Sequence, residues 1–197
     1  RQIWYEEELE DVLGAKEPQI VTRKMRQAPL DQRDKVNVQV CGPKHFKAYQ
    51  NQNGLFANKE CGKTYDREEL DIVCDGIYVT VATWDKLNNK RNGNETEEAR
   101  YVISYEKCVN GKWYEIVCIP YGIGGITKKC LVPPPWCNGN DGKRMTGKDA
   151  SNCVFIAKDT FGMELIHLVN TRKVKSGGQL LVRYGSGYWR KYRYCLK

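Results

Sequence analysis

The sequence predicts a mainly β fold with a minor helical part, and three observations lead to this class. Short runs rich in Val, Ile and Tyr recur along the chain and are bounded by turn residues. Asn110-Gly111 separates two such runs, as in a tight β-hairpin. The chain has 197 residues, of which 41% are hydrophobic, so it is long enough to bury a sizeable core.

The elements follow in chain order. Apolar residues on one side of segment 3–13, with Gly14 after it, predict a short N-terminal helix, and residues 15–34 are charged and irregular. We therefore expect a helix and charged arm in residues 1–35 and a β-rich domain in residues 36–197. Strands are predicted at 36–40, 69–74, 77–83, 100–105, 113–119, 153–157, 163–170 and 179–184. Residues 85–99 form a polar excursion, and 120–152 form a long irregular stretch of the kind that often carries function.

The charge is concentrated at the C-terminal end. The net charge is +8, and the residues after Glu164 include eight Lys or Arg and no Asp or Glu. Such an end suits contact with a polyanion, either a nucleic acid or the DNA around a chromatin substrate. An ordinary solvated basic surface is an equally simple interpretation.

Several classes of protein are not expected. The apolar runs are too short to span a bilayer. The nine cysteines show no Cys-x-x-Cys pair, and His45 and His167 are far apart, so neither a zinc site nor a disulfide framework is predicted. Reduced thiols indicate an intracellular protein, nuclear or cytoplasmic.

Four segments, in order, resemble the SET-domain family of protein lysine methyltransferases. They are Gly54-Leu55-Phe56-Ala57-Asn58-Lys59, the run from Glu69 to Gly76, the segment from Arg144 to Cys153, and the closing segment from Val169 to Tyr188 with its Leu-Leu and Tyr-Gly steps. The match covers roughly residues 36–190. Gln52 replaces a glycine that the family often has, and Gly147-Lys148 stands where Asn-His is usual. The PR subgroup also lacks that Asn-His pair, and its closing Tyr-Gly-x-x-Tyr is similar to the one here.

The resemblance implies a fold of several small curved sheets with a C-terminal segment threaded in a pseudoknot. It implies S-adenosylmethionine as cofactor and a protein substrate, namely a histone tail or nucleosome. Tyr184 would be the catalytic tyrosine, whose hydroxyl orients the attacking amine. The other site residues that it implies fall into two groups: Gly54, Leu55, Phe56, Arg144, Asn152 and Cys153 would lie against the cofactor, and Tyr105, Tyr121, Tyr188 and Trp189 would line the substrate channel.

Each of these residues also has a simpler interpretation. Tyr184 could end a core strand, Gly54 and Phe56 could belong to an ordinary turn and core, and Tyr188 with Trp189 could pack the C-terminal segment. Two other functions therefore stay open. One is a SET-like module without catalysis that binds chromatin or a protein, and the other is a β-rich nucleic-acid-binding domain.

Overall fold

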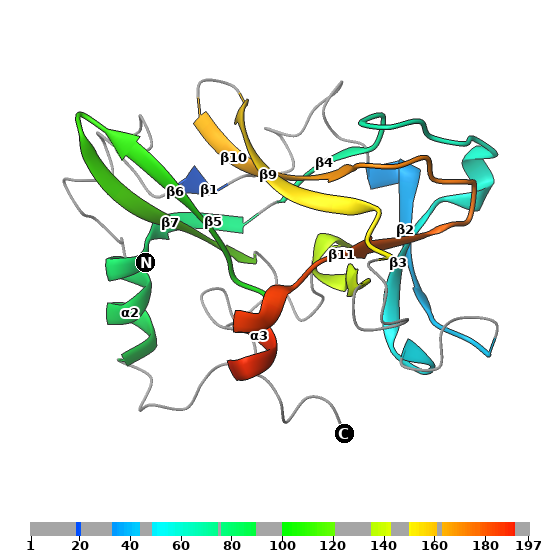
Figure 1. Cartoon of the computed structure of the whole chain (residues 1–197), viewed down its shortest axis with the longest axis horizontal. Coiled ribbons are helices and arrows are strands. Elements are labelled where there is room, and N and C mark those ends of the chain that lie inside the picture. Colours follow the sequence, from blue (N-terminus) through cyan, green and yellow to red (C-terminus); the bar gives the residue numbers. More distant parts are fainter. Residues whose placement is uncertain are drawn as a thin grey trace. The chain divides into compact units, whose positions relative to one another are not determined.

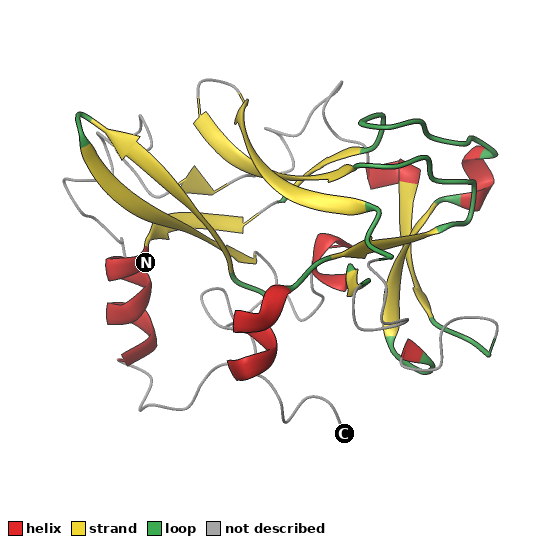
Figure 2. Cartoon of the chain, viewed as in Figure 1, coloured by secondary structure: helices red, strands yellow, loops and turns green. Residues whose placement is uncertain are grey.

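In its described residues the protein is mostly β, in three small sheets with few and short helices (Figures 1 and 2). The computed structural model describes residues 19–20, 33–43, 49–74, 76–89, 100–120, 135–142, 150–160 and 163–191. The mainly β class predicted from the sequence is confirmed. The helix predicted at 3–13 lies outside the described residues.

The chain forms two compact units. Unit 1 comprises Arg1–Gln27, Cys74–Pro134 and Ala157–Ile166, and unit 2 comprises Ala28–Val73, Pro135–Ile156 and His167–Lys197. The expected division of the chain near residue 35 stays a prediction, because most residues before it lie outside the description.

Unit 1 contains an antiparallel four-stranded sheet. Its strand order is β1 (Gln19–Ile20), β5 (Gly76–Thr80), β7 (Lys112–Pro120), β6 (Ile103–Val109). Asn110 and Gly111 join β6 to β7 with φ angles of 50° and 77°, the left-handed backbone that a two-residue hairpin turn requires. The predicted hairpin is therefore confirmed.

A helix, α2 (Val81–Asn89), directly follows β5, so the predicted strand 77–83 was too long. Thr80 explains the change of structure, because its Oγ1 accepts a hydrogen bond from the Thr83 N–H at 3.3 Å, as in an N-cap. Trp84 of the new helix packs on a buried cluster of Val79, Val117 and Ile119. The predicted polar excursion at 85–99 was also wrong at its start, since the helix continues to Asn89.

Unit 2 contains a second four-stranded sheet, in the order β2 (Val36–Val40), β3 (Asn53–Ala57), β11 (Gln179–Val182), β8 (Asn140–Asp141). β3 is antiparallel to both β2 and β11, whereas β8 runs parallel to β11. The C-terminal strand β11 therefore lies inside the sheet with a partner on each edge. Residues Cys41, Tyr49, Phe56 and Leu181 form a buried cluster beside it.

The third sheet has the order β4 (Asp71–Val73), β10 (Met163–Asn170), β9 (Cys153–Thr160). His167 is buried, and its Nδ1 lies 2.6 Å from Oδ1 of Asp71 on the neighbouring strand. Asn170 is also buried, and its Oδ1 accepts from the Leu70 N–H at 2.8 Å. These contacts hold His167 and Asn170 within this sheet and the loop before β4.

The remaining described elements are short. They are the 3-10 turns η1 (Arg33–Lys35), η3 (Lys59–Cys61) and η5 (Pro135–Asn138) and the helix α3 (Gly185–Lys191). Neither α3 nor β8 is predicted from the sequence, and the last strand, predicted to end at residue 184, ends two residues earlier. No helix in the described part of the chain is long and apolar enough to cross a membrane.

Candidate functional site

The candidate site is built around the end of β11 in unit 2. On one edge Gln179 and Leu180 pair with Phe56 and Leu55 of β3, and on the other Leu181 and Val182 pair with β8. Leu180, Leu181 and Val182 are buried, as the Leu-Leu-Val run predicts. A strand held on both edges fixes the direction in which the chain leaves it, and the next residues are Arg183 and Tyr184.

Asn152 fastens the segment before β9 to β11. Its Nδ2 donates to the Gln179 carbonyl at 2.8 Å, and its Oδ1 accepts from the Leu181 N–H at 2.7 Å. Its own N–H donates to the Leu181 carbonyl at 2.9 Å. The side chain thus mimics a strand neighbour, satisfying backbone groups that would otherwise lack partners. Asn152 thus lies beside the C-terminal strand, and its predicted contact with a cofactor stays a prediction.

Two chain segments meet very closely at Gly142. A Cβ at this position would lie 2.5 Å from the Ser151 backbone nitrogen and 2.7 Å from its Cα, so only glycine fits. The Gly142 N–H donates to the Val182 carbonyl at 2.7 Å, and its carbonyl accepts from the Ala150 N–H at 3.3 Å. Segments 140–142 and 150–152 therefore lie together against β11.

Tyr184 stands at the exit of β11 and is half-buried. Its hydroxyl donates a hydrogen bond to the Gly139 carbonyl at 2.6 Å. Gly185 follows with a φ of 82°, a left-handed conformation that turns the chain into α3. The strand, the hydrogen bond and the turn together hold the phenol in one place.

Tyr188 and Trp189 of α3 complete an aromatic cluster with Tyr184. The Tyr184 and Trp189 rings stack with centroids 5.6 Å apart, and Tyr188 meets the Tyr184 ring edge-on at 4.6 Å. The indole N–H of Trp189 donates to the Asp141 carboxylate, and the Tyr49 hydroxyl donates to the Asp141 carbonyl. Asp141 itself is buried. Tyr188 and Trp189 thus pack on the C-terminal segment, as in the simpler of their two interpretations, and their role in a substrate channel stays a prediction.

Most of the residues predicted to lie against a cofactor pack within the sheet or pair with its neighbouring strands. Leu55 and Phe56 have buried side chains, and their main chain lies between β2 and β11. A Cβ on Gly54 would lie 2.8 Å from Cys41 Sγ and 2.9 Å from Gln179 Nε2. The structure thus explains this glycine by the side chains packed over it.

Cys153 is buried at the start of β9, and desolvation raises its pKa to about 12. Its thiol therefore stays protonated and unreactive at neutral pH. Arg144 lies outside the described residues, so its predicted role is not addressed by the structure.

An open pocket of about 330 Å³ adjoins the end of β11 on the Arg183 side. Its lining comprises Ser151, Cys153, Val154, Phe155, Thr171, Val182 and Arg183. Phe155, Thr171 and Arg183 were not singled out from the sequence, and no local signal in the chain distinguishes them from ordinary strand and turn residues.

The two remaining channel candidates are Tyr105 and Tyr121. Tyr105 belongs to β6 in unit 1, where its hydroxyl donates to the Glu164 carbonyl at 2.7 Å and burial raises its pKa. Tyr121 lies outside the described residues.

Sequence reasoning missed Gly139, Asp141, Gly142 and Tyr49, which support the cluster. The Asn-Gly-Asn-Asp-Gly run at 138–142 was the available signal, because its turn residues suit a tight chain crossing. Among the described residues, no group of three His, Cys, Asp or Glu side chains could hold a metal ion.

No family model matches the chain, and no curated protein matches it. Among solved structures it is similar to the crystal structure of CpSET8 from Cryptosporidium, with 17% sequence identity and a TM-score of 0.47. The similarity covers 77% of this chain and 57% of that chain, so this chain spans little more than half the length of CpSET8.

Proposed function

We propose that this chain is an S-adenosylmethionine-dependent protein lysine methyltransferase of the SET type, with a histone tail as its substrate. The observation that carries the proposal is the fixed phenol of Tyr184, whose hydroxyl donates to the Gly139 carbonyl at 2.6 Å. Tyr184 follows the C-terminal strand β11, in the closing segment that resembles the family and whose tyrosine the resemblance implies to be catalytic.

The hydrogen bond decides what the Tyr184 oxygen can do. A phenol has one proton to donate, and here that proton is directed at a carbonyl. The oxygen is then an acceptor toward its other side. It can accept a hydrogen bond from the N–H of a neutral lysine amine and so direct the nitrogen lone pair at an electrophilic carbon. Holding reactants in this way is the main contribution that an enzyme makes to such a displacement.

The surroundings of Tyr184 favour a cationic partner. Three aromatic rings lie together there, and the buried carboxylate of Asp141 accepts from Trp189. Ring faces and a carboxylate attract both an ammonium and a sulfonium group. When bound, S-adenosylmethionine would supply a methyl group on such a sulfonium. The ring faces and the Asp141 carboxylate at the end of β11 fit this cation. Tyr184 and the segment from Gly139 to Asp141 would hold the sulfonium part of the cofactor.

Exposed basic residues of unit 2 suit a chromatin substrate in the nucleus. Arg172, Lys175, Arg183 and Arg190 are exposed in unit 2. They would contact DNA phosphates while the histone tail enters the site. Lys173 adds less charge to this surface, because its Nζ lies 2.9 Å from the Asp66 carboxylate.

A second candidate function is a SET-like binding module without catalysis. The space beside Gly54 is filled by Cys41 and Gln179, and the backbones of Leu55 and Phe56 pair with neighbouring strands. Together with Gln52 and Gly147-Lys148, these features favour weak cofactor binding. Such a module would keep the chromatin contact and lack the transfer activity.

Calorimetric titration with S-adenosylmethionine, followed by a radiolabelled transfer assay on nucleosomes, tests both candidates. We expect Tyr184→Phe to keep cofactor affinity and to lower the transfer rate about a hundredfold, the usual scale for removing one positioned polar group at a reacting centre. Tyr65→Phe is the matched control, because Tyr65 is a buried tyrosine of the same unit away from the cluster. Absence of cofactor binding at millimolar concentration would refute the enzyme and leave the binding module.

A further inference from the structure

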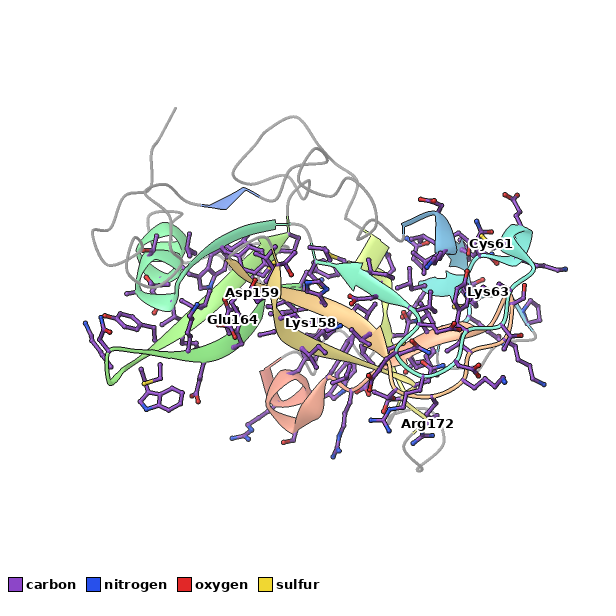
Figure 3. All side chains as sticks on the ribbon, turned by 90° about the horizontal axis from the view of Figure 1, so that it is seen from above. Cys61, Lys63, Lys158, Asp159, Glu164 and Arg172 are labelled. Carbon is purple, nitrogen blue, oxygen red and sulfur yellow. The ribbon has the colours of Figure 1, made fainter. Side chains whose placement is uncertain are left out.

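The β6–β7 hairpin of unit 1 has two chemically different faces. Side chains alternate along each strand, and residues paired across the two strands point to the same face. One face carries Tyr105, Lys107 and Tyr114. There Lys107 Nζ lies 3.2 Å from the carboxylate of Glu164, a residue labelled in Figure 3, and the Tyr105 hydroxyl donates to the Glu164 carbonyl. This face is therefore engaged within the unit.

The opposite face, here called the hairpin face, comprises Ser104, Glu106, Cys108, Trp113 and Glu115. All five residues are exposed. Trp113 is paired with Cys108 and is 68% exposed, the largest value among the exposed large hydrophobic residues of the described chain. Covering this indole buries a large apolar surface, which favours a partner that also accepts a hydrogen bond from the ring N–H.

The hairpin face continues inward into the core. Val117 and Ile119 lie on the same side of β7 as Trp113, and both are buried under Val81 and Trp84 of α2. Helix α2 thus covers the inner end of this sheet surface, and the outer end next to it is bare. The exposed end of the sheet surface therefore lies next to the buried apolar residues Val117 and Ile119, and α2 bounds it on that side.

Glu106 and Glu115 face each other directly across the two strands. Like charges in this arrangement destabilise a sheet. Neither carboxylate has an ion-pair partner among the described residues, and no described Lys or Arg lies on the hairpin face. Within the described part of the chain, the face therefore holds two negative charges without a compensating cation, on a chain whose net charge is +8. A cationic group placed over both carboxylates would remove their repulsion.

We propose that the hairpin face is a docking surface for a lysine- and arginine-rich peptide. Basic side chains lie between the Glu106 and Glu115 carboxylates, and one of them, or its aliphatic stem, lies on the Trp113 ring, where the cation is attracted to the ring face. Charge complementarity selects this occupant over an acidic or neutral peptide. The proposal stands apart from the methyltransferase assignment, because its test measures binding and uses neither cofactor nor transfer.

The test is fluorescence anisotropy with a labelled peptide of alternating lysine, arginine and glycine, on the full chain at low and at physiological salt. We expect Glu106→Gln with Glu115→Gln to weaken binding between about two- and thirtyfold, the range for losing two exposed ion pairs. The matched control is Glu60→Gln with Glu68→Gln, which changes the net charge equally at two exposed acids of η3 and the following loop and leaves affinity unchanged. Trp113→Ala weakens binding, and Trp113→Phe retains most of it.

Stability separates docking from a structural role. Removing the facing charges leaves the melting temperature unchanged or raises it, while the peptide affinity falls. Equal affinity in the Glu106 and Glu115 double variant and the wild type would overturn the proposal, as would an equal loss in the control pair. Failure of the wild type to bind the peptide at millimolar concentration would also overturn it. So would a dimer that Trp113→Ala dissociates, since a second copy would then be the occupant.

Discussion

The two hydrogen bonds from the Asn152 side chain to β11 lead to a quantitative prediction about the free energy of unfolding. In the Asn152→Ala variant both side-chain hydrogen bonds to β11 are lost, those with the Gln179 carbonyl and the Leu181 N–H. Leu181 is buried, so its N–H is left with little access to water, and Gln179 is half-buried. A buried backbone group without a partner costs about 1–3 kcal/mol.

The two losses together predict a decrease of about 2–4 kcal/mol in the free energy of unfolding, since Gln179 regains part of its hydrogen bonding from water. This is a large share of the roughly 5–15 kcal/mol that stabilises a typical domain. The assay is urea unfolding followed by far-UV circular dichroism, with the midpoint and the slope compared between variants.

Asn37→Ala is the matched control. Asn37 lies on β2 of the same sheet and is half-buried, but its buried Oδ1 has no hydrogen-bond partner in the described structure. Removing this oxygen should leave the free energy of unfolding unchanged or slightly higher. The reasoning fails if Asn152→Ala and Asn37→Ala unfold at the same urea concentration, or if Asn152→Ala matches the wild type.

Three further outcomes follow from the same structure. Gly142→Ala should not fold to the native state, because its Cβ would lie 2.5 Å from the Ser151 backbone nitrogen. The control Gly187→Ala, whose Cβ meets nothing within 4 Å, should fold normally. Equal circular dichroism spectra for the two variants would contradict this reasoning. Iodoacetamide labelling, read by mass spectrometry, should modify the exposed Cys61 and Cys108 first and leave Cys153 unmodified up to about pH 10, because burial raises the pKa of Cys153 to about 12. Early labelling of Cys153 in the folded protein would refute the burial argument. The pKa of Glu69 is lowered, mainly by the hydrogen bond from the Asp66 N–H, so Glu69 stabilises the fold above the pKa of an unfolded glutamate and this contribution is lost as the pH falls through the lowered value. In the Glu69→Gln variant the free energy of unfolding should therefore fall less steeply with decreasing pH on the acid side. A pH dependence identical to that of the wild type would exclude this contribution.

The sequence alone predicted the elements that depend on residues close to one another in the chain. The Asn110-Gly111 turn and strands such as β2 and β10 depend on residues a few positions apart, and their alternation of apolar residues is visible in the chain. Helix α2 was missed because Val81 and Thr83 continue a β-prone run. The Thr80 cap and the packing of Trp84 on Val117, which is distant in sequence, override that propensity.

The candidate site shows the same division. The tyrosine at the end of a Leu-Leu-Val strand, followed by a glycine, is a property of the sequence alone, and so is the chain's concentration of positive charge after Glu164. The tertiary structure decided which groups surround Tyr184. Gly139 lies 45 residues before Tyr184, and Asp141 lies 48 residues before Trp189. They reach these aromatic residues only because β8 pairs with β11 and Gly142 permits a close crossing. Contacts at this separation depend on strand pairing and on excluded volume, neither of which any local pattern of residues specifies.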